Sequence, residues 1–190
     1  METDKYKQDL KNQLKEAYGQ LVYTYTACFK ESYIRSCFYN CLKTFRIVLS
    51  SASTLGFFSI IISDSQTLIW ITGLISVILL VYTLLFKEFE QVLQSIEHYE
   101  SCSKELWIIR ERYKSLITDV PYIDIEDIKS NRDTLLKETD KIYKKFKKTG
   151  KLAYRLAQKA LKNNQEQYFE QDELNSILPE HLRSEKHESR

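Results

Sequence analysis

Glycine and proline are scarce: the 190-residue chain has four glycines and two prolines. A protein built of strands and tight turns needs these residues at frequent intervals, so we expect long helices instead. The four glycines are isolated from one another, which excludes a glycine-rich phosphate loop. The three histidines have no nucleophile at a recognisable spacing. We therefore predict an all-α protein that is not an enzyme and uses no metal or cofactor.

Charge is also nearly absent between Ile47 and Phe86, where Asp64 is the single charged residue. Asp64 separates uncharged runs of 17 and 22 residues, each long enough to cross a bilayer core as a helix. Adjacent spans of this kind must be helical, because lipid offers no hydrogen-bond partner to the backbone. The sequence predicts a membrane hairpin with a tight turn at Asp64, although the mean hydropathy of -0.39 is typical of a soluble protein.

The cations near the two runs predict the orientation. Lys43 and Arg46 precede the first run and Lys87 follows the second, whereas the turn has neither lysine nor arginine. By the positive-inside rule both termini are expected in the cytoplasm. The charged N-terminus does not resemble a secretory signal peptide. In that reducing compartment the four cysteines should be thiols, and Cys37 and Cys41, on one helix face, favour packing over a metal site.

Apolar residues at three- and four-residue steps predict long helices on both sides of the hairpin. One stripe runs from Tyr6 to Cys28 and enters the first span without a proline; a second runs from Phe89 to Leu116 and ends before Pro121. The second span should continue directly into this second helix, and the two stripes should pair as an antiparallel cytoplasmic stalk. The predicted organisation is an N-terminal amphipathic helix (1–44), two membrane helices (45–63 and 67–86) around a turn (64–66), a helical extension (87–120), C-terminal helices (121–182) and a frayed tail (183–190).

Hydroxyl-bearing and small residues are concentrated in the hairpin. Gly56 and Gly73 lie at nearly equal depth and are expected to form a close helix contact. The hydroxyls either pack the two helices together or line a water-filled path when several hairpins assemble. Asp64 is either an ordinary turn residue or one member of a carboxylate ring at a pore mouth. The candidate residues for pore lining or span packing are Ser50, Ser53, Gly56, Ser59, Ser63, Asp64, Gly73 and Ser76.

Nine lysines or arginines and no acidic residue occur from Lys141 to Lys162, and aromatic rings are interleaved with the cations. Such a segment can face a protein partner, dock on anionic headgroups, or contact nucleic acid through cations and stacking rings. A membrane location favours the first two, and direct binding of nucleic acid is the least favoured. The candidate contacts are Lys144, Lys145, Lys147, Lys148, Lys151 and Arg155.

The order of these segments resembles the SLATT family, bacterial two-transmembrane effector domains that associate with SMODS and SLOG proteins in conflict systems. The most similar stretches are 105–119, which follows the second span, 149–162, and 173–179. The shared residues are mostly helix-packing positions, together with Arg110 and Tyr113. The likeness extends over nearly the whole chain.

The resemblance implies a pore-forming or membrane-disrupting effector in the bacterial inner membrane, which arrests or kills an infected cell in antiviral defence by abortive infection. It would act as a homo-oligomer in the lipid bilayer, and a separately encoded sensor or nucleotide-synthesising enzyme would activate it. The alternative is a membrane-anchored adaptor or scaffold, whose hairpin is a passive anchor and whose cytoplasmic helices bind a partner.

Overall fold

The computed structural model describes residues 2–62, 66–86 and 90–167, together with 170, 173, 176, 177 and 179. Every regular element in these residues is a helix: α1 (Glu2–Ile62), α2 (Gln66–Phe86), α3 (Glu90–Asp119), α4 (Ile125–Lys145) and α5 (Lys151–Lys162). The predicted all-α class is thus confirmed for the described residues. The predicted turn at Ser63 and Asp64, and most of the small helix expected at 172–178, lie outside the described residues.

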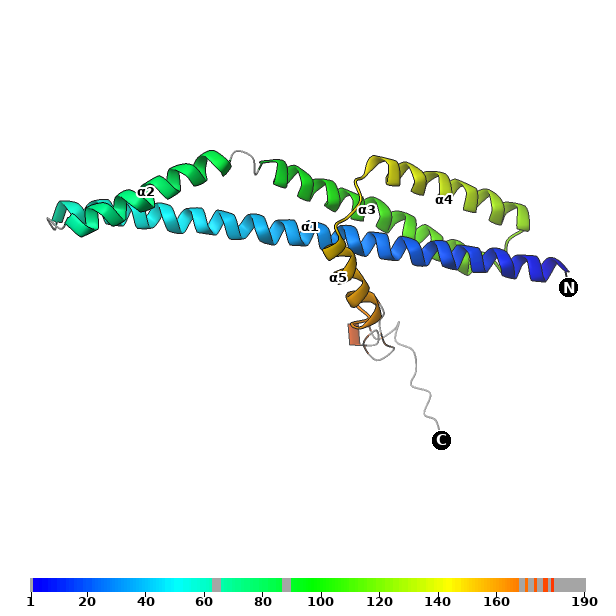
Figure 1. Ribbon diagram of the computed structural model, residues 1–190. Coiled ribbons are helices and arrows are strands. Elements are labelled where there is room, and N and C mark those ends of the chain that lie inside the picture. Colours follow the sequence, from blue (N-terminus) through cyan, green and yellow to red (C-terminus); the bar gives the residue numbers. More distant parts are fainter. Residues whose placement is uncertain are drawn as a thin grey trace, which may run out of the picture.

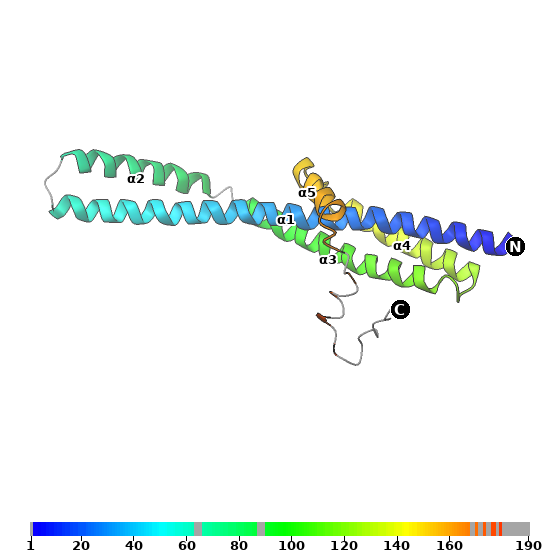
Figure 2. The ribbon, with the colours of Figure 1, turned by 90° about the horizontal axis from the view of Figure 1, so that it is seen from below.

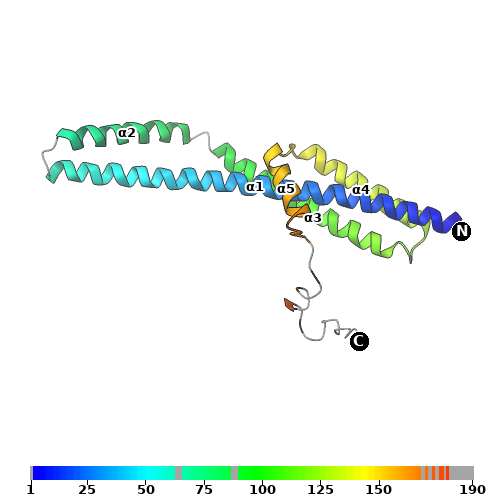
Figure 3. The same ribbon diagram turned by 60° about the horizontal axis from the view of Figure 1, so that its bottom comes forward.

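Helix α1 runs the length of an elongated molecule (Figure 1). Its 61 residues correspond to about 90 Å at the rise of an α-helix. Helix α2 lies antiparallel along one end of α1, and α3 and α4 lie along the other end (Figure 2). Helix α5 crosses α1 near its middle, beside α3 (Figure 3). The predicted single helix from the N-terminus through the first apolar run is confirmed by α1. No proline interrupts this stretch, so the helix can continue without a break.

The hydrophobic core lies between the N-terminal half of α1, α3 and α4. The predicted stripes supply it: Leu14 and Leu21 of α1, with Leu106 and Tyr113 of α3, are almost completely buried. Helix α4 adds Ile128, Leu135 and Ile142 on the expected helical face. The predicted antiparallel pairing of the two stripes is confirmed, and α3 is the element that α1 contacts most.

Helix α5 packs on α1 through alanines. Ala153, Ala157 and Ala160 recur at four- and three-residue steps and are all buried. Side chains this small let two helices approach closely, and the rings of Tyr23 and Tyr154 meet beside them at 6.4 Å. The connection after α4 therefore brings the cation-rich segment back against the middle of α1.

The expected continuous helix from the second span into the extension crosses residues 87–89, which lie outside the described residues. Helix α2 ends at Phe86, α3 begins at Glu90, and the two helices point in different directions (Figure 1). Helix α1 faces α3 with Cys28 and α2 with Gly56, which are 28 positions apart. At 3.6 residues per turn these positions lie on faces about 80° apart, so one straight helix could not follow both.

One described helix, α2, is long and apolar enough to cross a membrane, over Gln66–Leu84. Only 6% of that stretch is buried within the chain, unlike the core helix of a soluble protein. The first predicted span, 45–63, is not among the helices that meet this criterion, and Ser63 lies outside the described residues. The antiparallel pairing of α1 and α2 is therefore observed, whereas a hairpin that crosses the membrane twice stays a prediction.

Candidate functional site

The C-terminal end of α1 contacts α2 at three levels. Near the predicted cytoplasmic side, the Tyr82 hydroxyl donates a hydrogen bond of 2.6 Å to the Leu42 carbonyl, and its ring meets that of Phe45 at 5.7 Å. Halfway along, the Oγ atoms of Ser53 and Ser76 are hydrogen bonded at 2.9 Å. These contacts hold the two helices in a specific antiparallel register.

The third level joins Gly56 to Thr72. A Cβ atom placed on Gly56 would clash with Thr72 Oγ1 and lie 2.9 Å from Thr72 Cγ2, so any side chain there requires Thr72 to move. A Cβ on Gly73, by contrast, would meet no atom of the described residues within 4 Å. The expected contact between Gly56 and Gly73 is wrong. Equal depth does not place two residues on facing sides, and Gly73 is turned by about 100° from Thr72, its neighbour in α2.

This geometry predicts different effects at the two glycines. Gly56→Leu should force α1 and α2 apart, because the new side chain enters space that Thr72 fills, and overpacking costs about 1–3 kcal/mol. Gly73→Leu should leave the pair intact. The readout is the yield of the Ser53→Cys/Ser76→Cys disulfide in a chain without its native cysteines. An equal yield in the two leucine variants would contradict the assigned contact.

A second group of hydroxyls on α1 has no hydrogen-bond partner on the described part of α2. Ser50, Ser51, Thr54 and Ser59 are exposed. Three of them donate to the carbonyl four residues earlier: Ser51 to Ile47 at 2.9 Å, Thr54 to Ser50 at 3.0 Å and Ser59 to Leu55 at 2.9 Å. Bonds of this kind satisfy a hydroxyl within its own helix, so the residue is tolerated against lipid or water. The described candidate hydroxyls thus form two sets: Ser53 and Ser76 bind each other, whereas Ser50 and Ser59 are exposed, and Ser63 lies outside the described residues.

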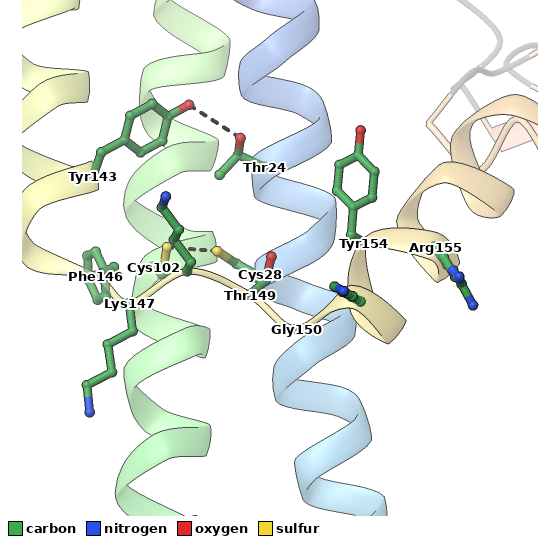
Figure 4. A pocket seen from close by; sticks show the side chains of 12 residues that line it. Thr24, Cys28, Cys102, Tyr143, Phe146, Lys147, Thr149, Gly150, Tyr154 and Arg155 are labelled. Carbon is green, nitrogen blue, oxygen red and sulfur yellow. Dashed lines mark hydrogen bonds between the residues drawn. The ribbon is translucent and has the colours of Figure 1, made fainter.

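The cation-rich segment borders a cavity of about 590 Å³ where α4, the 147–150 connection and α5 meet α1 and α3. Its wall includes the rings of Tyr143, Phe146 and Tyr154 and two thiols, Cys28 and Cys102 (Figure 4). Cavities of this size with mostly apolar walls are typical of small-molecule or side-chain binding sites. Lys147, Lys148, Lys151 and Arg155 also contribute to it.

The six predicted cationic contacts fall into two groups. Lys144 pairs with Asp140 and Lys145 pairs with Glu105, so these two stabilise the bundle itself. For the other four, the described residues supply no carboxylate within ion-pair distance. Lys147 and Arg155 extend outward from different sides of the cavity (Figure 4). The positive charge is therefore spread around the rim rather than gathered at one point.

Glu31 connects α1 to the 147–150 connection that borders the cavity. One carboxylate oxygen accepts a 2.9 Å hydrogen bond from the Gly150 N–H, at the start of α5, and the other lies 2.7 Å from Arg35 Nη2. The Arg35 guanidinium lies 5.1 Å from the ring centre of Tyr99, whose hydroxyl donates to the Lys148 carbonyl at 3.2 Å. Sequence reasoning missed Glu31. A single acid three residues after Cys28, on the buried face of α1, is the signal that could have indicated it.

Metal ligands do not gather anywhere in the described part of the chain: no three His, Cys, Asp or Glu side chains are placed to hold an ion there. Cys37 and Cys41 are exposed thiols on α1, and Cys28 and Cys102 are buried thiols.

The chain belongs to the SMODS and SLOG-associating two-transmembrane effector domains, the SLATT class. Within the class, the sequence model of family 4 matches residues 10–173, nearly the whole described region. The suspected family is thereby confirmed. Neither a curated protein nor a solved structure shows a significant match to the chain.

Proposed function

We propose that the protein is an oligomeric effector of a bacterial conflict system and opens a path through the inner membrane. The observation that carries this proposal is the exposed apolar helix α2, of which 6% is buried, held in register against an α1 segment rich in hydroxyls. An apolar surface of that length requires lipid or protein to cover it. Membership of a two-transmembrane effector family supports the same function.

A single helix pair cannot enclose water, so the path requires several copies in a closed ring. In this proposal the outward hydroxyls of α1 face the path, since Ser53, Ser76 and Thr72 already take part in the α1–α2 contact. The lining set is Ser50, Ser51 and Thr54, which lie within about 100° of one another around the α1 axis, whereas Ser59 lies on the opposite side from Ser50. A ring of Asp64 carboxylates at the outer mouth is compatible with this arrangement.

The cytoplasmic bundle receives the trigger. Cys28, at the cavity, precedes Ile47 by 19 residues, or about 28 Å of helix. If α1 crosses the bilayer along its normal, Lys147, Lys148, Lys151 and Arg155 lie well beyond the headgroups. That distance favours a partner in the cytoplasm, a separately encoded sensor or nucleotide-synthesising enzyme, over headgroup docking. Lys43 and Arg46 are the cations placed to meet anionic lipid.

The proposed topology has both termini in the cytoplasm, which thiol labelling can test. A cysteine at Ser65, in a chain without its native cysteines, should react with an impermeant reagent added outside intact spheroplasts, since positive charge is confined to the other side. A cysteine at Ser189 should react only after lysis. Labelling of the Ser189 variant in intact spheroplasts would overturn the orientation.

The second candidate function is a membrane-anchored adaptor. It is favoured by the hydrogen bond between Ser53 and Ser76, which uses two span hydroxyls for packing within one chain. Ion leakage from vesicles separates the candidates, because a passive anchor leaves vesicles tight whatever partner is added.

A further inference from the structure

Two buried thiols face each other in the centre of the bundle. Cys28 lies on α1 and Cys102 on α3, and their Sγ atoms are 2.9 Å apart although the residues are 74 positions apart in the chain. Each side chain is 2% exposed. Both positions belong to the apolar stripes, so packing alone would accept alanine, valine or leucine there. Two sulfurs in contact offer a chemistry that those residues do not.

The thiols also border the cavity. Figure 4 shows their side chains directed at each other from α1 and α3, beside the 147–150 connection. A small oxidant can therefore approach the sulfurs through the cavity. Cys37 and Cys41 are exposed on α1 and have no such enclosure.

The two thiols are not equivalent. The hydrogen bond from Cys102 lowers the pKa of the Cys28 thiol below its usual range, although burial and the charge of Glu31 oppose this. The pKa of Cys102 is raised, first by its hydrogen bond to Cys28 and then by burial. The first proton is thus lost from Cys28, and a thiolate is the form that attacks an oxidant.

We propose that Cys28 and Cys102 form a redox modification site, at which a peroxide converts the two thiols into a disulfide that joins α1 to α3. In the first step the Cys28 thiolate attacks one peroxide oxygen, the O–O bond breaks, and the leaving hydroxide takes a proton to become water. In the second step the Cys102 sulfur displaces hydroxide from the Cys28 sulfenic acid, and a second water leaves. The two thiols lose two electrons in total, which reduce one peroxide to water.

The disulfide would link Cys28, which precedes both apolar runs in the chain, to Cys102, which follows them. Because it joins α1 to α3 covalently, it would prevent α1 from sliding along α3. The sulfurs need to approach by about 1 Å, which small changes of side-chain torsion can provide. This inference goes beyond the proposed membrane function and does not depend on it.

The test uses the full chain, purified in detergent, reduced, and then treated with hydrogen peroxide, before it is unfolded in denaturant and its free thiols are blocked with N-ethylmaleimide. Intact mass should show two maleimide adducts instead of four and a loss of about 2 Da for the bond. Peptide mapping should identify a linked pair containing Cys28 and Cys102. The Cys37→Ser/Cys41→Ser chain, altered only at exposed positions, should form the same bond.

The assigned roles predict a difference between the single variants. Cys102→Ser should accumulate a sulfenic acid at Cys28 that dimedone traps, whereas Cys28→Ser should give little trapping at Cys102, whose proton is held more tightly. Four maleimide adducts after peroxide, a bond between other cysteines, or oxidation of Cys28 to sulfinic acid without a linked peptide would each overturn the proposal. Should a single variant fail to fold, the linked peptide of the unmodified sequence still decides it.

Discussion

Replacing Ser50 and Thr54 together with leucine is expected to abolish growth arrest while the protein stays in the membrane. Both side chains are exposed and have no hydrogen-bond partner on the described part of α2, so the change removes the polar surface that the proposed path requires without touching the α1–α2 contact. Neither charge nor orientation changes, and the apolar stretch becomes longer, which favours insertion. Growth after induction together with its trigger, and fractionation of the membranes, are the measurements.

The matched control is Ser53→Ala/Ser76→Ala. It removes two hydroxyls from the same spans, but these bind each other between α1 and α2. A hydrogen bond between membrane helices contributes roughly 0.6 kcal/mol, so the control should keep most of its activity. Full growth arrest by an inserted Ser50→Leu/Thr54→Leu chain would show that other residues line the path.

Leu106→Ala is expected to destabilise the bundle of α1, α3 and α4 more than any surface change. The Leu106 side chain is completely buried where α3 meets α1, and truncating a buried leucine costs about 3 kcal/mol or more because a cavity remains. For a domain of this size that corresponds to a fall of roughly 10 °C in the midpoint of thermal unfolding. Circular dichroism of the detergent-solubilised protein provides the measurement.

Leu136→Ala is the matched control for this loss. Leu136 is 48% exposed on α4, so the same three-carbon truncation opens no cavity there. Its midpoint should stay within a few degrees of the unmodified chain. Equal shifts for the two variants would contradict the assigned core.

The stalk could be predicted from sequence because its signal is periodic. Leu14, Leu21, Leu106 and Tyr113 recur at helical spacing, and burial of those stripes leaves few ways to pair two long helices. The absence of proline before Pro121 likewise predicted long helices. The cation-rich segment was recognised by composition, and four of its six candidate residues border one cavity.

Other features depend on rotation about helix axes, which spacing along one chain does not provide. Gly56 meets Thr72 rather than Gly73, and α3 points in a different direction from α2 (Figure 1). The contacts of Cys28 with Cys102, and of Glu31 with Gly150, join residues far apart in the chain. They become visible only when α1, α3 and α5 are placed together in space.

Ion release from sealed vesicles tests the central claim most directly. The full chain would be reconstituted at several protein-to-lipid ratios, with and without its separately encoded sensor, and release of trapped potassium would be followed. An oligomeric path predicts release that rises more steeply than linearly with protein density, depends on the trigger, and is lost in Ser50→Leu/Thr54→Leu. Vesicles that stay tight at every density and with every trigger, although the protein is inserted, would contradict the effector function and leave the adaptor.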